Sequence, residues 1–251
     1  MGSYKEFSPN VPEEWRTNIA IYPSVDTLSS IAFIHEERID PSHSSTRKNI
    51  PFDVSYESFL ADLLGEERAK TMSTRQIILW LSQSNVPFQV ITHSPIISCE
   101  SGVPFRGDHD LSHTLKCLVG VQSEETKGWH DKSIYGAGNS KYVLMVVPGN
   151  SKRVNISAIN RPYPTTAYEL ASIDVIPKLF AGTPRGGVSP FGGIFETRTF
   201  VDSSLTELAE KGEKVSLNAG RPDVSIIMNA ADYLEVEQPI LIDNLGGLDS
   251  Q

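Results

Sequence analysis

The chain is poor in the features that would commit it to an oxidising compartment or to a membrane. Its 251 residues include only two cysteines, Cys99 and Cys117, without paired spacing, which indicates a reducing compartment or no redox role. No apolar run approaches the length of a membrane span, and the opening MGSYKEFSPN lacks the apolar core of a signal peptide. With 39% hydrophobic and 21% charged residues, the composition excludes disordered and collagen-like classes. We therefore expect a soluble, cytoplasmic globular protein without a membrane partner.

An excess of positive charge is also missing. The net charge is -9, which argues against indiscriminate binding to nucleic-acid phosphates. The charge is uneven, however: residues 1–100 sum to -5, residues 101–200 to +3 and residues 201–251 to -7. The locally basic middle leaves room for one specific anionic ligand.

The familiar phosphate-binding and nucleophile motifs are absent as well. Gly182–Gly187 has P-loop glycine spacing, but Val188 and Ser189 stand where Lys and Ser/Thr are required. Gly136-Ala-Gly138 lacks the third glycine of a dinucleotide fingerprint. Ser189 is followed by Pro190, which does not match a nucleophile elbow. Nucleotide hydrolysis, dinucleotide redox chemistry and serine hydrolysis therefore lose support.

The periodicity of apolar residues predicts an α+β fold, with a mixed, mostly antiparallel sheet wrapped by helices. Capping boxes are expected at Ser73 with Gln76 and at Ser204 with Glu207. A partly helical stretch at 166–180 should break at Pro177, and the last residues, 241–251, should be frayed. The sequence predicts helices at 55–64, 73–85, 204–211 and 230–236, and strands at 88–92, 114–119, 141–147, 199–202, 215–218 and 224–228.

His109-Asp-Leu-Ser-His113 could place two histidines on one helix face as zinc ligands, with His130 available as a third. Asp110 is shorter than the glutamate usual in such sites, and Pro104 and Gly107 weaken a helix here. A surface loop with two polar histidines is the simpler interpretation, and we expect no metal cofactor.

The loop Gly186-Gly-Val-Ser-Pro190-Phe-Gly192 favours a ligand-binding role. Its glycines allow the backbone to approach a ligand closely, and successive N–H groups can form a nest for an oxyanion. Lys116 lies in an apolar strand, where a cation is costly unless its head reaches water or an anion. A simple turn and an edge-strand lysine are the alternatives.

From Ser73 to Val236 the chain resembles the YbaK/ProX family of aminoacyl-tRNA editing domains, which also occur inserted in prolyl-tRNA synthetases. The resemblance rests on the Lys116 strand, on GGVSPFG at 186–192, which carries the GxxxP loop of the family, and on Val215-Ser-Leu-Asn-Ala-Gly220. Further matching segments are Val86–Val90, Lys141–Pro148, Arg153–Ile156 and Thr199–Asp202.

The resemblance implies an aminoacyl-tRNA hydrolase that cleaves the 3′ ester of a mischarged tRNA carrying a small amino acid: alanine, cysteine, serine or threonine. The attack would be assisted by substrate or water and would need no metal. Lys116 would hold the phosphate of the terminal adenosine or the substrate end, and the backbone of 186–190 would fix the ester. The implied catalytic residues are Lys116, Gly186, Gly187, Ser189 and Pro190, and the implied substrate-binding residues are His93, His113, Phe191, Asn218, Gly220 and Ser225.

The chain departs from the family pattern in places. Leu115 separates His113-Thr114 from the lysine, Asn218 replaces a serine, Ser225 replaces an aspartate, and no histidine occurs between 218 and 221. These differences leave the edited amino acid open. A non-catalytic subunit that binds tRNA or a synthetase, in a multisynthetase complex for example, is the alternative, and a metal-dependent hydrolase using His109 and His113 is a third. We expect an extension at 1–70, an editing-like domain at 71–238 and a tail at 239–251.

Overall fold

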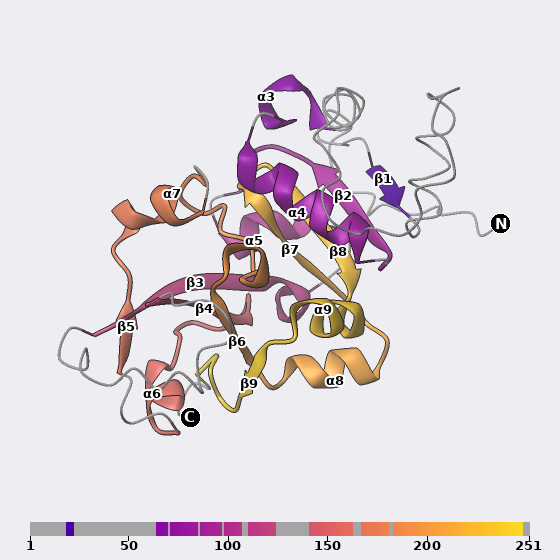
Figure 1. Ribbon diagram of the computed structural model, residues 1–251. Helices are drawn as coiled ribbons and strands as arrows, with labels where there is room; N and C mark the ends of the chain where they lie inside the picture. The colour runs from indigo at the N-terminus through magenta and orange to yellow at the C-terminus, as the bar shows by residue number, and fades with distance from the viewer. Residues whose placement is uncertain are drawn as a thin grey trace, which may run out of the picture.

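The computed structural model describes residues 19–22, 64–69, 71–84, 86–96, 98–106, 110–123, 141–162, 167–180 and 183–247 (Figure 1). The predicted helix at 55–64, apart from Leu64, lies outside these ranges, as do His109 and His130. Within them, no helix combines the length and apolarity needed to cross a membrane.

One sheet has four strands in the order β1-β2-β8-β7, and all its pairings are antiparallel. Three of its strands, β2, β7 and β8, were predicted because their residues alternate or are continuously apolar. The strands are β1 (Ile19–Tyr22), β2 (Phe88–Thr92), β7 (Lys214–Arg221) and β8 (Val224–Asn229).

The second sheet has five strands in the order β5-β3-β4-β6-β9. β3 pairs antiparallel with β4 and β5, whereas β4–β6 and β6–β9 are parallel. The strands are β3 (Leu115–Gln122), β4 (Tyr142–Pro148), β5 (Tyr168–Leu170), β6 (Arg198–Asp202) and β9 (Ile240–Ile242).

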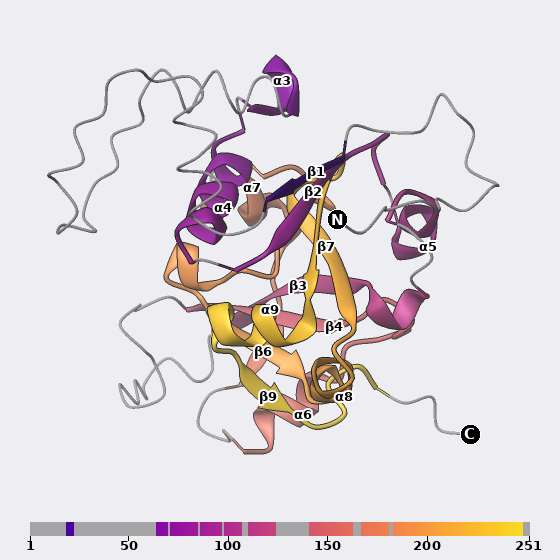
Figure 2. The same ribbon diagram turned by 90° about the vertical axis from the view of Figure 1, so that its right-hand side faces the viewer.

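The two sheets meet where Thr114, just before β3, forms an isolated bridge with Ser216 of β7. The largest core cluster packs strands of the four-stranded sheet against α4 (Met72–Gln83), α8 (Leu205–Glu210) and α9 (Ala230–Glu237). Figures 1 and 2 show α4 against this sheet and α8 beside α9. The α+β class is thus confirmed, although the strands form two sheets where one was expected.

Shorter helical segments connect these elements. They are α3 (Glu66–Ala69), α5 (Cys99–Gly102), η2 (Val103–Phe105), η3 (Leu111–His113), α6 (Ile156–Asn160), η5 (Ile173–Val175), α7 (Ile176–Leu179) and η6 (Gly193–Phe195).

Both predicted capping boxes are wrong, although the helices they mark are present. α4 begins at Met72 with Thr71 at the N-cap and no side-chain cap. The Ser73 hydroxyl instead donates to the Gly220 carbonyl at 3.3 Å. Ser204 caps α8 without a side-chain bond, and its N–H donates to Asp202 Oδ1 at 2.9 Å. At Ser73 a contact with distant β7 replaces the predicted box, and at Ser204 a contact with Asp202, two residues earlier, replaces it.

Two other expectations are corrected. Residues 168–170 form β5. Pro177 lies in the first turn of α7 without breaking it, because N–H groups of the first turn have no acceptor within the helix and proline loses no hydrogen bond there. Residues 240–242 form β9 next to β6, so this part of the C-terminal region is not frayed.

Candidate active site

The glycine loop 186–192 lies against β7 through its first residues. Gly186 has a φ of +80°, the left-handed region that favours glycine. At Gly187 a Cβ would lie 3.0 Å from the Arg221 Cα, so only glycine lets the two backbones approach this closely. The Gly187 N–H donates to the Pro184 carbonyl at 3.0 Å, which closes a turn before the loop.

A buried polar network connects this loop to residues far away in the sequence. Arg106 donates from Nε to Ser225 Oγ at 2.9 Å and from Nη2 to Asn218 Oδ1 at 2.5 Å. Asn218 in turn donates from Nδ2 to the Gly186 carbonyl at 2.6 Å. Arg106 is 2% exposed, and burial lowers its pKa to about 10, so it remains a cation at neutral pH.

His93 completes the network in a defined tautomer. Its Nδ1 lies 2.8 Å from the Ser94 carbonyl, which can only accept, so Nδ1 carries the proton. Its Nε2 therefore accepts from Ser225 Oγ at 2.8 Å. Burial lowers the pKa of His93 to about 4, so the ring is neutral and both nitrogens are engaged.

Lys116 lies on β3 opposite Val147, half-buried. β5 pairs only with residues 120–122 of β3, so within the described strands Lys116 is at the sheet edge. Burial raises the pKa of the Cys99 thiol, while the charges of Arg106 and Lys116 both act to lower it. Two cations therefore lie near Cys99, at the start of α5.

The far end of the loop is held by α9. The Tyr233 hydroxyl donates to the Pro190 carbonyl at 2.9 Å. The buried Glu237 carboxylate accepts from the Gly192 N–H at 2.8 Å, from the Gly193 N–H and from Thr199 Oγ1. Burial raises the pKa of Glu237 to about 7, although these hydrogen bonds act to lower it. One helix thus fixes residues 190–193.

The structure brings His93, Asn218 and Ser225 together with Gly186, and it places two other predicted residues elsewhere. His113 lies 3.5 Å from Asp110 Oδ1 and 3.8 Å from Glu213 Oε2, as ring nitrogen to oxygen distances. Phe191 is fully buried in the main core, where its ring lies 5.4 Å from that of Trp80. Neither side chain joins the network.

The remaining predicted residues contribute through backbone or burial. Ser189 is buried, and its Oγ has no hydrogen-bond partner among the described residues. Its carbonyl accepts a long contact from the Cys117 thiol at 3.7 Å. Gly220 has a φ of +82° and would place a Cβ 2.7 Å from Ser73 Oγ. Cys117 itself packs on the core, and because successive strand residues alternate, Lys116 faces the other side of β3.

The residue that sequence reasoning missed is Arg106. In the sequence Arg106 stands outside every motif on which the resemblance rests. Its partners lie 112 and 119 residues further along the chain, so no local pattern could indicate them. The metal hypothesis rests on His109, outside the described part, within which no group of three His, Cys, Asp or Glu could hold an ion.

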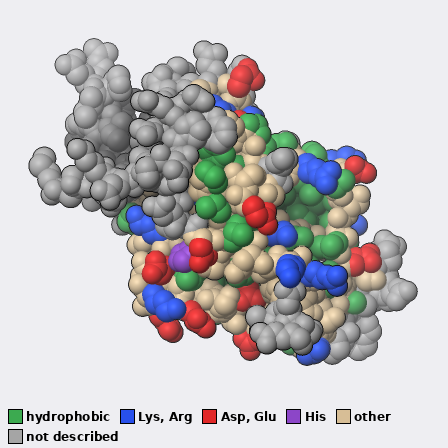
Figure 3. All heavy atoms as spheres, turned by 180° about the vertical axis from the view of Figure 1, so that it is seen from behind, with side chains coloured by type: hydrophobic (Ala, Val, Ile, Leu, Met, Phe, Trp, Pro, Cys, Tyr) green, Lys and Arg blue, Asp and Glu red, His purple; other side chains and the backbone are tan. Residues whose placement is uncertain are grey.

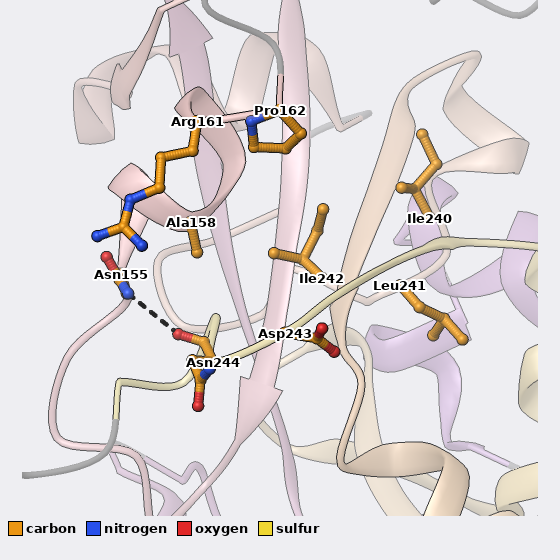
Figure 4. A pocket seen from close by; sticks show the side chains of 9 residues that line it. All are labelled: Asn155, Ala158, Arg161, Pro162, Ile240, Leu241, Ile242, Asp243 and Asn244. Atoms are coloured by element: carbon orange, nitrogen blue, oxygen red, sulfur yellow. Dashed lines mark hydrogen bonds between the residues drawn. The ribbon is translucent and has the colours of Figure 1, made fainter.

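A cavity of about 410 Å³ lies away from this network (Figure 4). It is lined by Asn155, Ala158 and Arg161 on one side and by β9 and the turn after it on the other. Asn155 Nδ2 donates to the Asn244 carbonyl at 3.2 Å across its floor. None of the network residues lines it. On the face of the molecule shown in Figure 3, basic and acidic side chains are interspersed.

The chain thus combines an α+β fold with a glycine loop that is held at both ends, at Gly186 through Asn218 and Arg106 and at residues 190–193 by α9. Residues 131–236 match the family model of the aminoacyl-tRNA editing domain. The match covers less than half of the chain and includes the GGVSPFG loop, on which the resemblance rests.

The relatives agree with this assignment. The multifunctional Ser/Thr-tRNA deacylase ProXp-y of Escherichia coli (strain K12) is 28% identical over 178 residues, which cover 70% of this chain and 96% of the relative. A crystal structure of a hypothetical protein superposes with a TM-score of 0.50 at 18% identity, covering 67% of this chain and 97% of the other. A scaffold protein used for epitope grafting gives a TM-score of 0.50 at 14% identity, covering 69% and 97%. At these identities the two structures support the fold alone.

Proposed function

We propose that this protein is a trans-acting deacylase that hydrolyses the ester between a mischarged small amino acid and the 3′ end of its tRNA. The observation that carries the proposal is a pair of cations: Arg106, linked through Asn218 to the Gly186 carbonyl of the glycine loop, and Lys116 at the edge of β3, whose charges both act on the Cys99 thiol. The match of residues 131–236 to the aminoacyl-tRNA editing domain and the name of the ProXp-y relative, a Ser/Thr-tRNA deacylase, support it.

The Lys116 ammonium is proposed to hold a phosphate or the substrate end. It lies on a strand whose neighbours fix its Cα, while its edge position leaves the head free to reach an anion. A point charge placed before the reaction stabilises negative charge as it develops, without reorganisation.

The loop is proposed to fix the ester. Because the Gly187 N–H is used by Pro184 and Pro190 has no N–H, the remaining donors of 186–190 belong to Gly186, Val188 and Ser189. In the reaction the oxygen of water or of a substrate hydroxyl attacks the carbonyl carbon. The bond to the ribose oxygen breaks, that oxygen takes the proton, and the amino acid leaves as a carboxylate when water is the final acceptor.

His93 has a different part in this proposal. Both of its ring nitrogens are engaged and its pKa is lowered to about 4 by burial. It is therefore proposed to hold Ser225, and general-base chemistry is left to the substrate or to solvent.

The substrate set is alanine, cysteine, serine or threonine, and the partner is the mischarged tRNA. The relative's name favours serine and threonine. Association with an aminoacyl-tRNA synthetase stays a prediction, as do the domain bounds at 70 and 238.

The experiment is deacylation of labelled alanyl-, cysteinyl-, seryl- and threonyl-tRNA, each on its cognate tRNA and on proline tRNA. Rapid release of at least one small amino acid is the expected result. No release from any of them, together with retention of tRNA or of a synthetase in a pull-down that depends on residues 1–70, would favour the non-catalytic subunit. Stoichiometric zinc in the purified protein would instead favour the hydrolase using His109 and His113.

A further inference from the structure

Arg106 is a buried cation whose hydrogen bonds go to neutral side chains. It is 2% exposed and donates to Ser225 Oγ and Asn218 Oδ1. Burying a charge is costly, and an apolar side chain of similar volume is often no less stable in such a place. A guanidinium can, however, fix the orientation of its partners, because it only donates hydrogen bonds and never accepts them.

The donor-only character of Arg106 determines the orientation of the Asn218 amide. With a pure donor on one side, Oδ1 faces Arg106 and Nδ2 faces the Gly186 carbonyl, 2.6 Å away. The flipped amide would set Nδ2 against the guanidinium and Oδ1 against the Gly186 oxygen, so both contacts would become repulsive.

We propose that Arg106 is a positioning residue, which locks the first residues of the glycine loop by fixing Asn218 as the donor to Gly186. Tyr233 and Glu237 hold residues 190–193, so the loop is anchored at both ends and Arg106 serves the end that begins at Gly186. The consequence for catalysis rests on the proposed function, whereas the consequence for the loop does not.

The first arm measures amide hydrogen exchange over residues 183–193 in the wild type, Arg106→Met and Asn218→Asp. Asn218→Asp keeps an oxygen for Arg106 but replaces the donor by an oxygen that repels the Gly186 carbonyl. Loop exchange should rise about fivefold to tenfold in both variants, as expected for one lost hydrogen bond. Arg161→Met, which removes an exposed guanidinium at the cavity that no network residue lines, should leave it unchanged.

If Arg106 served stability alone, loop exchange would rise only where the melting temperature falls. Asn218→Asp separates the two effects, because it strengthens the pairing with Arg106. Under the proposal, its melting temperature should not fall while its loop exchange rises. Should Arg106→Met fail to fold, Asn218→Asp decides alone. Unchanged loop exchange in Asn218→Asp would overturn the proposal.

The second arm is a double-mutant cycle of kcat and KM with Arg106→Met and Asn218→Ala. If Arg106 acts through Asn218, the double variant loses no more kcat than Asn218→Ala alone, and KM changes less than kcat. Additive losses in kcat would overturn the proposal. If the wild type deacylates no tRNA, the proposed function fails, and the exchange experiment still decides the role of Arg106.

Discussion

At the residue scale, the site depends on close approaches that only glycine permits. Gly220, on β7 beside the network residue Asn218, has a φ of +82° and would place a Cβ 2.7 Å from Ser73 Oγ and 2.9 Å from the Thr74 backbone nitrogen. The second of these atoms belongs to the backbone of α4 and cannot rotate away. The packing of α4 on β7 therefore depends on the missing side chain.

We expect Gly220→Ala to lower the free energy of unfolding by about 2–4 kcal/mol, from backbone strain and overpacking together. Gly212→Ala is the matched control, because Gly212 has a φ of +68° with nothing within 4 Å of its added Cβ. It should show only the backbone cost, about 1 kcal/mol. Urea denaturation of both variants is the measurement, and equal losses would show that the contact with α4 is unimportant.

At the element scale, α9 couples the loop to a carboxylate that titrates near neutral pH. The Glu237 carboxylate is buried, with a pKa of about 7 against an ordinary value of 4.5. Its charge also raises the pKa of the neighbouring Cys117 thiol and Tyr233 hydroxyl, in addition to their burial. Between pH 4.5 and 7 the folded chain therefore holds a proton at this site that the unfolded chain has released.

Stability from this group should accordingly fall as pH rises through that window. Glu237→Gln keeps an oxygen to accept from Gly192 and Thr199 but does not titrate. We expect the free energy of unfolding of the variant, relative to that of the wild type, to rise by about 3 kcal/mol from pH 4.5 to pH 8. Urea unfolding at several pH values measures this difference. Parallel curves for the two proteins would contradict the shifted pKa.

The elements also show what a sequence can and cannot predict. Six strands and three helices were expected close to their observed positions, because continuous or alternating apolar residues must be buried. The edge strands β1, β5 and β9 were missed, since each is four residues or fewer and leaves little periodicity. Gly186 and Asn218 were selected from motifs, but Arg106 was not, because its role exists only once distant strands fold together.

At the scale of the whole molecule, parts of the N-terminal extension expected at residues 1–70 pack on the rest of the fold. β1 pairs with β2 along four residues, and Leu64, 1% exposed, belongs to the main core. Arg68 forms an ion pair with Asp223 at 2.9 Å. Residues before 71 thus contribute to the sheet and the core that support β7 and its site residues.

Deleting residues 1–70 should therefore lower the free energy of unfolding by more than about 2 kcal/mol, the loss expected for one buried leucine alone. It should also promote self-association, because the edge of β2 becomes exposed. Leu64→Ala in the full chain is the control and should reproduce the loss of stability without the association. Unfolding and light scattering measure both effects, and a truncated chain as stable and monomeric as the full one would contradict this view.

The most direct test of the central claim is single-turnover deacylation of seryl- and threonyl-tRNA by the wild type and Lys116→Ala, side by side. We expect Lys116→Ala to lose at least about 100-fold in rate, while its stability changes by less than about 1 kcal/mol, as for other side chains at a strand edge. Lys178→Ala, which removes an exposed lysine on α7, should keep the wild-type rate. Rapid deacylation that persists unchanged in Lys116→Ala would contradict the role assigned to this lysine.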